Sequence, residues 1–314
     1  MPGLRVQPFA EEHLDAAAAL LAARHRRHTE AEPLLTEPAD YRAEVEALWR
    51  GAEASGAVAQ RQGRIVGFLL GIRKNDGPWG PNVWVDPAGH AVEEAEDLRD
   101  LYAAAAARWV DEGRMRHYAV APASDAPLLE SWYRLGFGQQ QALGIRKVPD
   151  AAMPENVRVA EERDVEALVE LGTLLPDHQG RSPVFSGWRA LETEEEQRQE
   201  VIDDLANPDL ALLIAEENGR VVGGFELAPT TLSSMHSSLA RVEGAVLLGW
   251  AVTRPEARGS GAGVALTEGS FAWAREHGYE VMVTDWRVTN LLASRFWSRR
   301  GFRETFLRLY RSIP

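Results

Sequence analysis

A glycine-rich turn at residues 258–263, with the sequence Arg-Gly-Ser-Gly-Ala-Gly, limits the possible folds more than any other segment. An apolar, β-prone run from Ala245 to Val252 precedes the turn, and a run of helical character from Val264 to Glu276 follows it. Glycine lets the backbone approach an anion closely, and the N-terminus of a helix offers free N–H groups and a positive dipole end. The strand, turn and helix therefore predict an α/β fold with a phosphate-binding turn, to which Arg258 can add a bidentate contact.

Two common phosphate-binding turns are excluded by the residues that follow. A P-loop requires Gly-Lys-Ser/Thr for its lysine and its metal-binding hydroxyl, whereas Gly263 is followed by Val264 and Ala265. A dinucleotide fold requires G-x-G-x-x-G in its first βα unit, but Val264 stands at the third glycine position when the motif starts at Gly259. The turn also lies in the last fifth of the chain, which is the wrong place for a first unit.

The remaining pattern, Arg-x-x-Gly-x-Gly after a strand that ends at residues 251–255, resembles motif A of the GNAT superfamily of N-acetyltransferases. A second segment, residues 290–302, resembles GNAT motif B, Asn-x-x-Ala/Ser-x-x-Phe-Tyr-x-x-x-Gly-Phe. It follows a short β-prone run, and Gly301 is placed to end its helix. Because both motifs occur in the expected order, the chain is identified as a member of this superfamily.

The resemblance implies a binding site for acetyl-CoA as co-substrate, with no metal. In the family, the motif A turn holds the pyrophosphate, the motif B asparagine and helix line the pantetheine arm, and the motif A strand splays away from its neighbour. The predicted cofactor-binding residues are Trp250, Ala251, Val252, Arg258, Gly259, Ser260, Gly261, Ala262, Gly263, Asn290 and Trp297.

Composition narrows the function further. The chain of 314 residues contains no cysteine, which excludes disulfides, thiolate metal sites and a cysteine nucleophile. The formal net charge of −13 argues against nucleic acid as a partner. The first residues lack the apolar stretch of a signal peptide, and the run from Ala16 to Ala23 is too short to span a bilayer. These features predict a cytoplasmic protein without a membrane partner.

The sequence repeats itself, which predicts two tandem domains. Arg5-Val6 matches Arg158-Val159, Gly63-Arg64 matches Gly219-Arg220, and Gly136-Phe137 matches Gly301-Phe302, at offsets of 153, 156 and 165 (158 − 5, 219 − 63 and 301 − 136). The glycine–arginine pairs are interpreted as two-residue hairpin turns. The expected domains are residues 1–150 and 154–314, each a mixed, mostly antiparallel sheet of about six or seven strands flanked by helices. Residues 302–312 are expected to close the sheet of the second domain.

The repeat fails at the phosphate turn of the first copy. Residues 88–92, Ala-Gly-His-Ala-Val, are the expected counterpart and lack Arg-x-x-Gly-x-Gly; His90 is interpreted as a turn residue. Glu93, Glu94, Glu96 and Asp97 then crowd the start of the next helix, where they would repel a pyrophosphate. The first domain is therefore predicted to be degenerate and to have lost the pyrophosphate loop.

The resemblance implies direct transfer to an amine, which needs a base because an alkyl ammonium has a pKa of about 10. Candidates near strand ends are Glu226, Asp285, Glu243 and His236, with Glu226 preferred. Backbone N–H groups around residues 250–252 are expected to form the oxyanion hole.

The acid that protonates the leaving thiolate is, in many relatives, the motif B tyrosine, and Trp297 stands at that position. Indole cannot release its proton at a useful pH, so water or Tyr310 remains as the acid.

These features predict transfer of an acetyl group to a primary amine of a small molecule or peptide, through a ternary complex in the C-terminal domain. The turn-rich stretch 176–188 is expected to overhang the acceptor site. The two-copy layout is similar to GNAT enzymes of the mycothiol synthase type. Because of Trp297, the alternative is a catalytically silent acyl-CoA-binding sensor or assembly module. The chain is expected to be a monomer or a homodimer.

Overall fold

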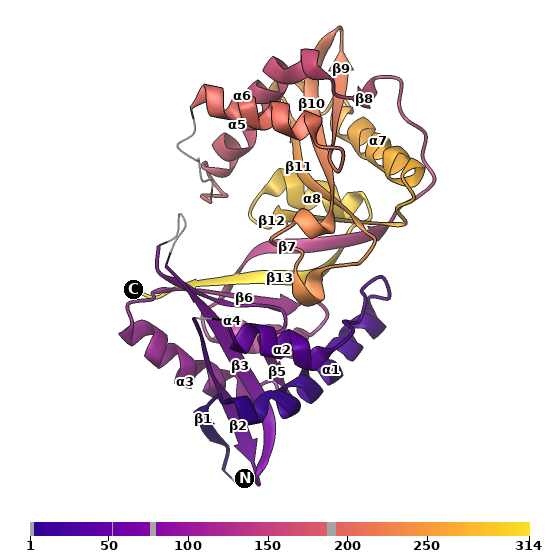
Figure 1. Cartoon of the computed structure of the whole chain (residues 1–314). Helices are drawn as coiled ribbons and strands as arrows, with labels where there is room; N and C mark the ends of the chain where they lie inside the picture. The colour runs from indigo at the N-terminus through magenta and orange to yellow at the C-terminus, as the bar shows by residue number, and fades with distance from the viewer. Residues whose placement is uncertain (1–2, 52, 76–79, 187–192) are drawn as a thin grey trace. The chain divides into compact units, whose positions relative to one another are not determined.

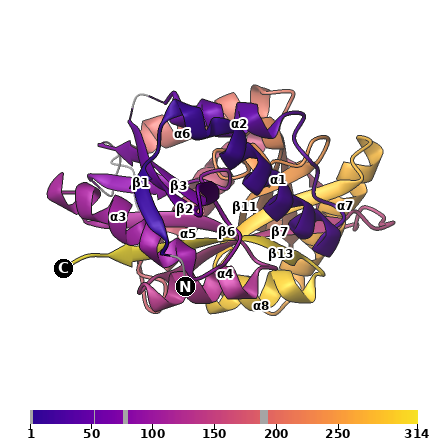
Figure 2. The ribbon, with the colours of Figure 1, turned by 90° about the horizontal axis from the view of Figure 1, so that it is seen from below.

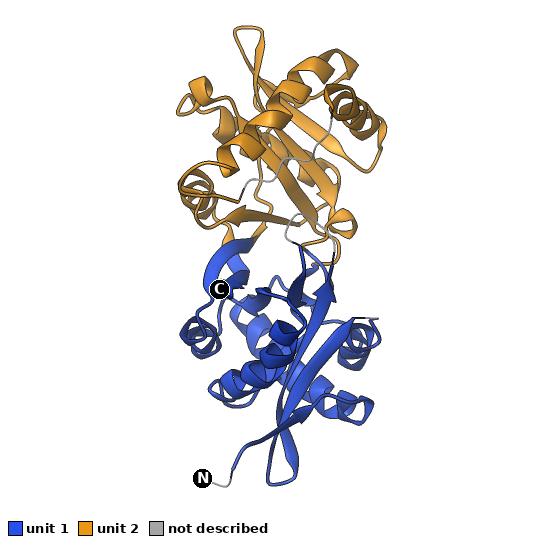
Figure 3. Ribbon diagram, turned by 90° about the vertical axis from the view of Figure 1, so that its left-hand side faces the viewer, with its two compact units in different colours: residues 1–143, 236–241, 304–314 blue, residues 144–235, 242–303 orange. Residues whose placement is uncertain are grey.

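The computed structural model describes residues 3–51, 53–75, 80–186 and 193–314, and Figures 1 and 2 show it from two directions. The chain divides into two compact units. Unit 1 comprises residues 1–143, 236–241 and 304–314, and unit 2 comprises residues 144–235 and 242–303 (Figure 3). Neither unit is continuous in sequence, because each includes segments that the other interrupts.

Unit 1 is a mixed sheet with helices on both faces. Its strands are β1 (Arg5–Pro8), β2 (Ala54–Arg61), β3 (Arg64–Lys74), β4 (Asn82–Val85), β5 (His90–Val92), β6 (Arg116–Pro122), the first part of β7 (Gly138–Lys147) and nearly all of β13 (Arg303–Ser312). Its helices are α1 (Leu14–Ala31), α2 (Tyr41–Trp49), α3 (Asp97–Asp111) and α4 (Ala126–Arg134). The strand order is β1-β2-β3-β4-β6-β13-β7, and β5 pairs with β3 beside β4.

Alternation along β3 places the helices of unit 1 on opposite faces of the sheet. A Cβ at Gly67 or Gly71 would meet Leu101 or Trp109 of α3, so this face of β3 lies against α3. Phe68, on the other face, lies against Phe9, which in turn packs on Trp49 of α2. Helices α1 and α2 contact each other, and Figure 2 shows them together across the sheet from α3.

The last strand of the chain belongs to unit 1, which corrects the expectation that residues 302–312 close the sheet of the second domain. Strand β13 pairs antiparallel with β6 from Phe306 opposite Pro122 to Ser312 opposite Arg116. Its apolar side chains Phe306, Leu307 and Leu309 are buried. In the other direction, β7 begins in unit 1 and ends in unit 2, where it lies next to β12. The two halves of the repeat thus contribute terminal strands to each other's units.

Unit 2 contains the motif-bearing half of the chain. Its strands are the end of β7, β8 (Val157–Val159), β9 (Ala211–Glu217), β10 (Arg220–Pro229), β11 (Val246–Thr253) and β12 (Val281–Arg287), in the order β7-β12-β11-β10-β9-β8. Its helices are α5 (Val165–Gln179), α6 (Glu194–Ala206), α7 (Ala262–Glu276) and α8 (Leu291–Arg299). The sheets and helices of both units match the predicted fold class. Helix α5 continues through Pro176, so the stretch after residue 176 is helical up to Gln179 rather than a loop; Trp188 lies outside the described residues.

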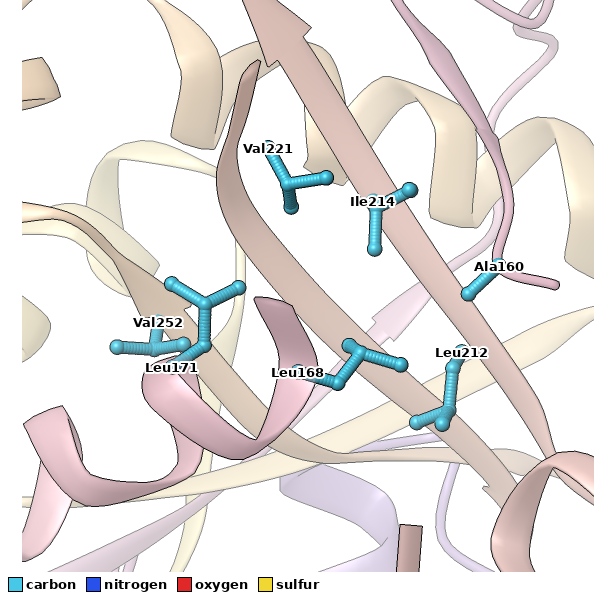
Figure 4. Close-up of a cluster of buried hydrophobic side chains, with 7 residues drawn as sticks. All are labelled: Ala160, Leu168, Leu171, Leu212, Ile214, Val221 and Val252. Carbon is cyan, nitrogen blue, oxygen red and sulfur yellow. The ribbon is translucent and has the colours of Figure 1, made fainter. Parts of the chain in front are cut away.

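The core of unit 2 fixes α5 against the sheet. Seven buried apolar side chains, from α5, β9, β10, β11 and the residue after β8, form one cluster, shown in Figure 4: Ala160, Leu168, Leu171, Leu212, Ile214, Val221 and Val252. Helix α7 covers the opposite face, since a Cβ at Gly223 would meet Leu266, whereas one at Gly224 would meet Trp250 and Leu171. Packing therefore determines which face of the sheet at β10 and β11 lies against α5 and which lies against α7.

The predicted splay is present in unit 2. Strands β11 and β12 pair in parallel only from Val246 to Leu248, although β11 continues to Thr253. Opposite β10, the register shifts between Phe225 and Leu227, so that Gly249 and Trp250 face the single residue Glu226. This β-bulge turns the end of β11 away from β12, and none of the strands in the described residues pairs with that edge of residues 249–253.

The hairpin turns lie one residue earlier than predicted. Gln62 and Gly63 have φ values of 53° and 80°, and Asn218 and Gly219 have φ values of 52° and 75°. Arg64 and Arg220 instead pair across the turns with Arg61 and Glu217. Two successive positive φ values give the type I′ geometry that suits a two-residue hairpin, and asparagine and glycine tolerate it best.

His90 lies in a strand, so its interpretation as a turn residue was wrong. In unit 1 the strand equivalent to β11 is interrupted after Val85, and His90–Val92 resume it as β5. The His90 side chain is fully buried and lies 3.0 Å from the backbone oxygen of Val120. The turn before α3 is therefore residues 93–96, Glu-Glu-Ala-Glu, and it is shorter and more acidic than the motif A turn.

Buried histidines make unit 1 sensitive to acid. Burial lowers the pKa of His28 and His90 to about 3 and that of His117 to about 4. In the unfolded chain these groups bind protons near pH 6.5, so the unfolded state takes up more protons below that pH and stability falls as the pH falls. We expect the free energy of unfolding of unit 1 to drop by roughly 4–6 kcal/mol between pH 7.5 and pH 5.

This expectation is checked by measuring the free energy of unfolding at each pH with denaturant, using hydrogen exchange of the amides in β2 and β3 to monitor unit 1. His117→Gln cannot take up its proton and should reduce the slope of stability against pH by up to one proton between pH 6.5 and pH 4. An unchanged stability of unit 1 at pH 5 would contradict the burial of these rings.

Candidate active site

The motif A turn has the geometry of an anion site. Gly259 and Gly261 have φ values of 88° and 104°, which favour glycine, and Gly261 is the N-cap of α7. Within the described residues, the backbone N–H groups of Gly261, Gly263 and Val264 have no hydrogen-bond acceptor. The Arg258 side chain is exposed beside them. Free N–H groups at the start of a 15-residue helix, together with a guanidinium, suit a phosphate.

Three predicted cofactor-binding residues take other places. The Ser260 hydroxyl donates to Glu217 Oε1 at 2.5 Å and so points to the end of β9. Ala262 is buried in the first turn of α7. The side chain of Trp250 lines a second cavity on the α5 face rather than the one next to the glycine turn.

A cavity of about 380 Å³ runs from the glycine turn along the splay. It brings together residues from α5, β10, β11, the turn, α7 and α8, and the predicted ones among them are Ala251, Val252, Arg258, Gly259, Gly261, Gly263, Asn290 and Trp297. Asn290 Oδ1 accepts from the backbone N–H groups of Leu292 and Ala293, which caps α8, and from Nε2 of His178 at 3.1 Å. His178 is not predictable as a residue of this cavity, because only the fold brings α5 to the start of α8.

Trp297 fills the position of the family's tyrosine with a buried ring. Its indole packs on Phe225, Phe296 and Phe302, with ring centroids 5.8, 4.9 and 5.4 Å away. The side chain therefore forms an apolar wall of the cavity.

A larger cavity, of about 910 Å³, is lined in part by the other residues of the β-bulge. Neighbouring residues of two strands line different cavities: Phe225 and Ala251 line the smaller one, and Glu226 and Trp250 the larger one. The rest of the larger cavity comes from α5, from α6, from Leu212 of β9 and from Arg254, which follows β11. Its carboxylates are Glu170, Glu194, Glu200, Asp204 and Glu226.

Glu226 has the electrostatic environment of a general base. Its burial, and then the negative charges of Asp204 and Glu200, raise the pKa of its carboxyl to about 7. The side chain stands at the bulge, and a Cβ at Gly249 would lie 3.0 Å from its Oε1. A carboxylate with a pKa near neutrality can both be ionised and accept a proton from an ammonium group.

The other candidates are placed differently. Asp285 lies on β12 and lines neither of the two cavities. Glu243 is exposed, and it too is absent from both linings. His236 is buried within a segment that belongs to unit 1. Tyr310 lies on β13 in unit 1, with its ring 5.0 Å from that of Tyr118.

Comparisons with known proteins agree with this geometry. Residues 175–302 match the sequence model of the acetyltransferase (GNAT) family. A GCN5-related N-acetyltransferase from Sphaerobacter thermophilus has a similar structure, with a TM-score of 0.57 and 15% identity over 98% of this chain and 95% of that one. A tandem GNAT protein from the clavulanic acid biosynthesis pathway has a TM-score of 0.51 and 15% identity over 99% and 98% of the two chains. No curated protein matches the sequence.

The chain has the fold of tandem GNAT proteins, and its residues 175–302 match the GNAT family model. Its resemblance to the mycothiol synthase type stays a prediction. Within the described residues, no helix combines the length and the apolar character that crossing a membrane requires.

Proposed function

We propose that unit 2 transfers the acetyl group of acetyl-CoA to a primary amine, within a ternary complex. The observation that carries this proposal is that neighbouring residues of the β-bulge of β10 and β11 line two different cavities. One cavity ends at an anion-binding turn, and the other presents a carboxylate with a raised pKa. A thioester that enters from the turn and an amine that enters from the acidic cavity would meet at residues 225–226 and 250–251.

In this mechanism Glu226 accepts a proton from the bound ammonium group, which frees the nitrogen lone pair. The nitrogen attacks the thioester carbonyl, and backbone N–H groups of the unpaired edge of residues 249–253 stabilise the oxyanion. The C–N bond forms, the C–S bond breaks, and the second proton of the nitrogen passes to the thiolate through water. A thiol has a pKa of about 8.5, so the thiolate leaves without a strong acid and Trp297 is no obstacle.

Acetyl-CoA binding tests the cofactor site. We expect Arg258→Ala to weaken binding about tenfold, because it removes a charge-assisted contact to phosphate, and Gly261→Glu to abolish binding, because it adds a side chain and a negative charge at a φ of 104°. Isothermal titration calorimetry measures both changes. Arg275→Ala, at the opposite end of α7, is the matched control and should leave the affinity unchanged. Equal affinity of Arg258→Ala and the parent protein would contradict the phosphate assignment.

The same titration tests unit 1, for which we propose no acetyl-CoA site. Asp125 caps α4 where Asn290 caps α8, and the turn before α3 carries glutamates in place of Arg-x-x-Gly. The buried Arg24 side chain donates to the backbone oxygens of His90 and Pro87. These two acceptors at the interrupted strand are therefore already hydrogen-bonded within unit 1. The expected stoichiometry is one acetyl-CoA per chain, and two would contradict this assignment.

A silent acyl-CoA-binding protein is the second candidate, and the packing of Trp297 favours it. The indole leaves no hydroxyl at the position of the family's acid. Thiol release measured across a panel of amines distinguishes the two functions: acetyl-CoA binding that depends on Gly261, without release for any amine, would favour the silent protein.

A further inference from the structure

We infer that His178 binds acyl-CoA together with Asn290, and that the two side chains hydrogen-bond one secondary amide of the ligand's pantetheine arm. This inference rests on the proposed function, because it assigns a further binding residue to the acyl-donor cavity of unit 2. The two residues come from different walls of that cavity, since His178 belongs to α5 and Asn290 caps α8.

The hydrogen bonds of Asn290 fix which end of its side-chain amide is left for a ligand. Its Oδ1 accepts from the backbone N–H groups of Leu292 and Ala293, at 3.2 and 3.3 Å, and from Nε2 of His178 at 3.1 Å. Only the oxygen of an amide accepts from N–H groups, so three donors already occupy Oδ1. Within the described part of the chain, Nδ2 donates to no acceptor, and it is not sealed from solvent. Because Asn290 lines the cavity, it offers a ligand there one hydrogen-bond donor.

His178 supplies the complementary group. Because its Nε2 donates to Oδ1 of Asn290, the proton of the neutral ring is on Nε2, and Nδ1 carries a lone pair. The ring is half-buried, and among the described residues no donor reaches Nδ1. The hydrogen bond holds the ring against the amide of Asn290, so the pair offers one acceptor and one donor. A secondary amide has the opposite pair, a C=O that accepts and an N–H that donates.

The surroundings of the pair make such a contact valuable to a ligand. Apart from Thr253 and Arg258 beside the glycine turn, His178 and Asn290 supply the polar side chains of the described lining. The other side chains of the lining are aliphatic or aromatic, so an amide that enters the cavity loses water and needs protein partners. Acyl-CoA carries secondary amides between its diphosphate and its sulfur. The pair therefore recognises the arm of the ligand rather than its diphosphate or its acyl group.

Calorimetry with CoA and with 3′-phospho-ADP, which is CoA without its pantetheine arm, tests the inference without turnover. We expect His178→Phe to weaken CoA binding about three- to tenfold, because it removes a neutral hydrogen bond to the ligand, and to leave the affinity for 3′-phospho-ADP unchanged. His178→Gln offers both a donor and an acceptor and should restore most of the CoA affinity. His277→Phe, at the other end of α7 and outside both cavity linings, is the matched control and should change neither affinity.

Nitrogen-15 NMR of the histidine rings separates direct contact from mere support of Asn290. The Nδ1 resonance of His178 should shift when CoA is added and stay in place with 3′-phospho-ADP. A double-variant cycle then tests whether one amide is shared. Asn290→Asp keeps the cap of α8 and the acceptor for His178 but loses the Nδ2 donor. Its effect on CoA affinity and that of His178→Phe should not add, because both side chains bind the same group.

These measurements distinguish the inference from the proposed function. CoA binding that weakens in His178→Phe, without acetyl transfer to any amine, would support the inference and contradict the transferase. Acetyl transfer by a His178→Phe variant whose CoA affinity equals that of the parent protein would leave the transferase intact and overturn the inference. An equal loss of affinity for CoA and 3′-phospho-ADP, or an Nδ1 resonance that CoA does not shift, would also overturn it.

Discussion

Glu226→Gln is expected to lower kcat by about 100- to 1,000-fold while leaving the acetyl-CoA affinity unchanged, because the amide cannot accept the proton of the acceptor ammonium. In the parent protein, kcat/KM should rise with pH and level off above about 7, where Glu226 is ionised. Assays of thiol release from pH 5.5 to pH 9 measure the kcat of the variant and the pH dependence of kcat/KM in the parent protein. The step near pH 7 should be absent from the residual activity of the variant.

The same substitution is expected to stabilise the protein. The pKa of Glu226 is raised in the folded state, so the folded state holds its proton more tightly than the unfolded chain, and stability falls as pH rises from about 4.5 through 7. Above pH 7 the charge is fully present, and its removal should increase the free energy of unfolding by about 1–3 kcal/mol. If the variant has lower activity but an unchanged or lower free energy of unfolding at pH 8, the folded state does not raise the pKa of Glu226.

Deletion of residues 303–314 is expected to unfold unit 1, although these residues lie at the opposite end of the sequence. The deletion removes Phe306, Leu307 and Leu309, whose burial stabilises by about 2 kcal/mol each, and the backbone pairing with β6. It also removes the ring of Phe306 from His28 and the backbone oxygen of Thr305 from the N–H of Ala123. The sum is comparable to the whole stability of a typical domain.

Hydrogen exchange distinguishes the two units in this experiment. Protection should be lost in β2, β3 and β6 and retained in β10 and α7. Deletion of residues 313–314 alone is the matched control and should change little, and a synthetic peptide of residues 301–314 added in trans should restore protection. Loss of protection in unit 2 with unit 1 intact would contradict the assignment of β13. A fragment that ends at residue 150 lacks β13 and should fail to fold for the same reason.

The glycine turn and the start of α8 were predictable because local rules govern their backbone. Glycines at positive φ, an asparagine cap and a helix N-terminus act within a few residues, so the spacing from Arg258 to Gly263 and from Asn290 onward predicts the structure. The capping box that Thr193 and Glu196 form at the start of α6 follows from the same kind of local rule. Even so, Trp250 and Ser260 point elsewhere, because the bulge and the end of β9 decide their directions.

The acceptor side could be predicted only in part. Glu226 was the preferred base, but its pKa is raised first by burial and then by Asp204 and Glu200, which lie 22 and 26 residues earlier in the sequence (226 − 204 and 226 − 200) and come close only when α6 packs beside β9. The acidic face of α6 is visible in the sequence as a helical repeat of carboxylates. A solvent-exposed helix has the same pattern, so the pattern alone does not indicate a cavity wall.

The sequence by itself determined the class of fold, the repeat, the position of the anion-binding turn and the difference between the two copies at that turn. These features depend on residues close together along the chain, whose backbone preferences are local. Only the tertiary structure decided which sheet receives β13, where the second cavity lies and which carboxylates surround Glu226. Local rules do not predict the strand exchange, because the continuous buried run at the centre of β13 would suit either sheet.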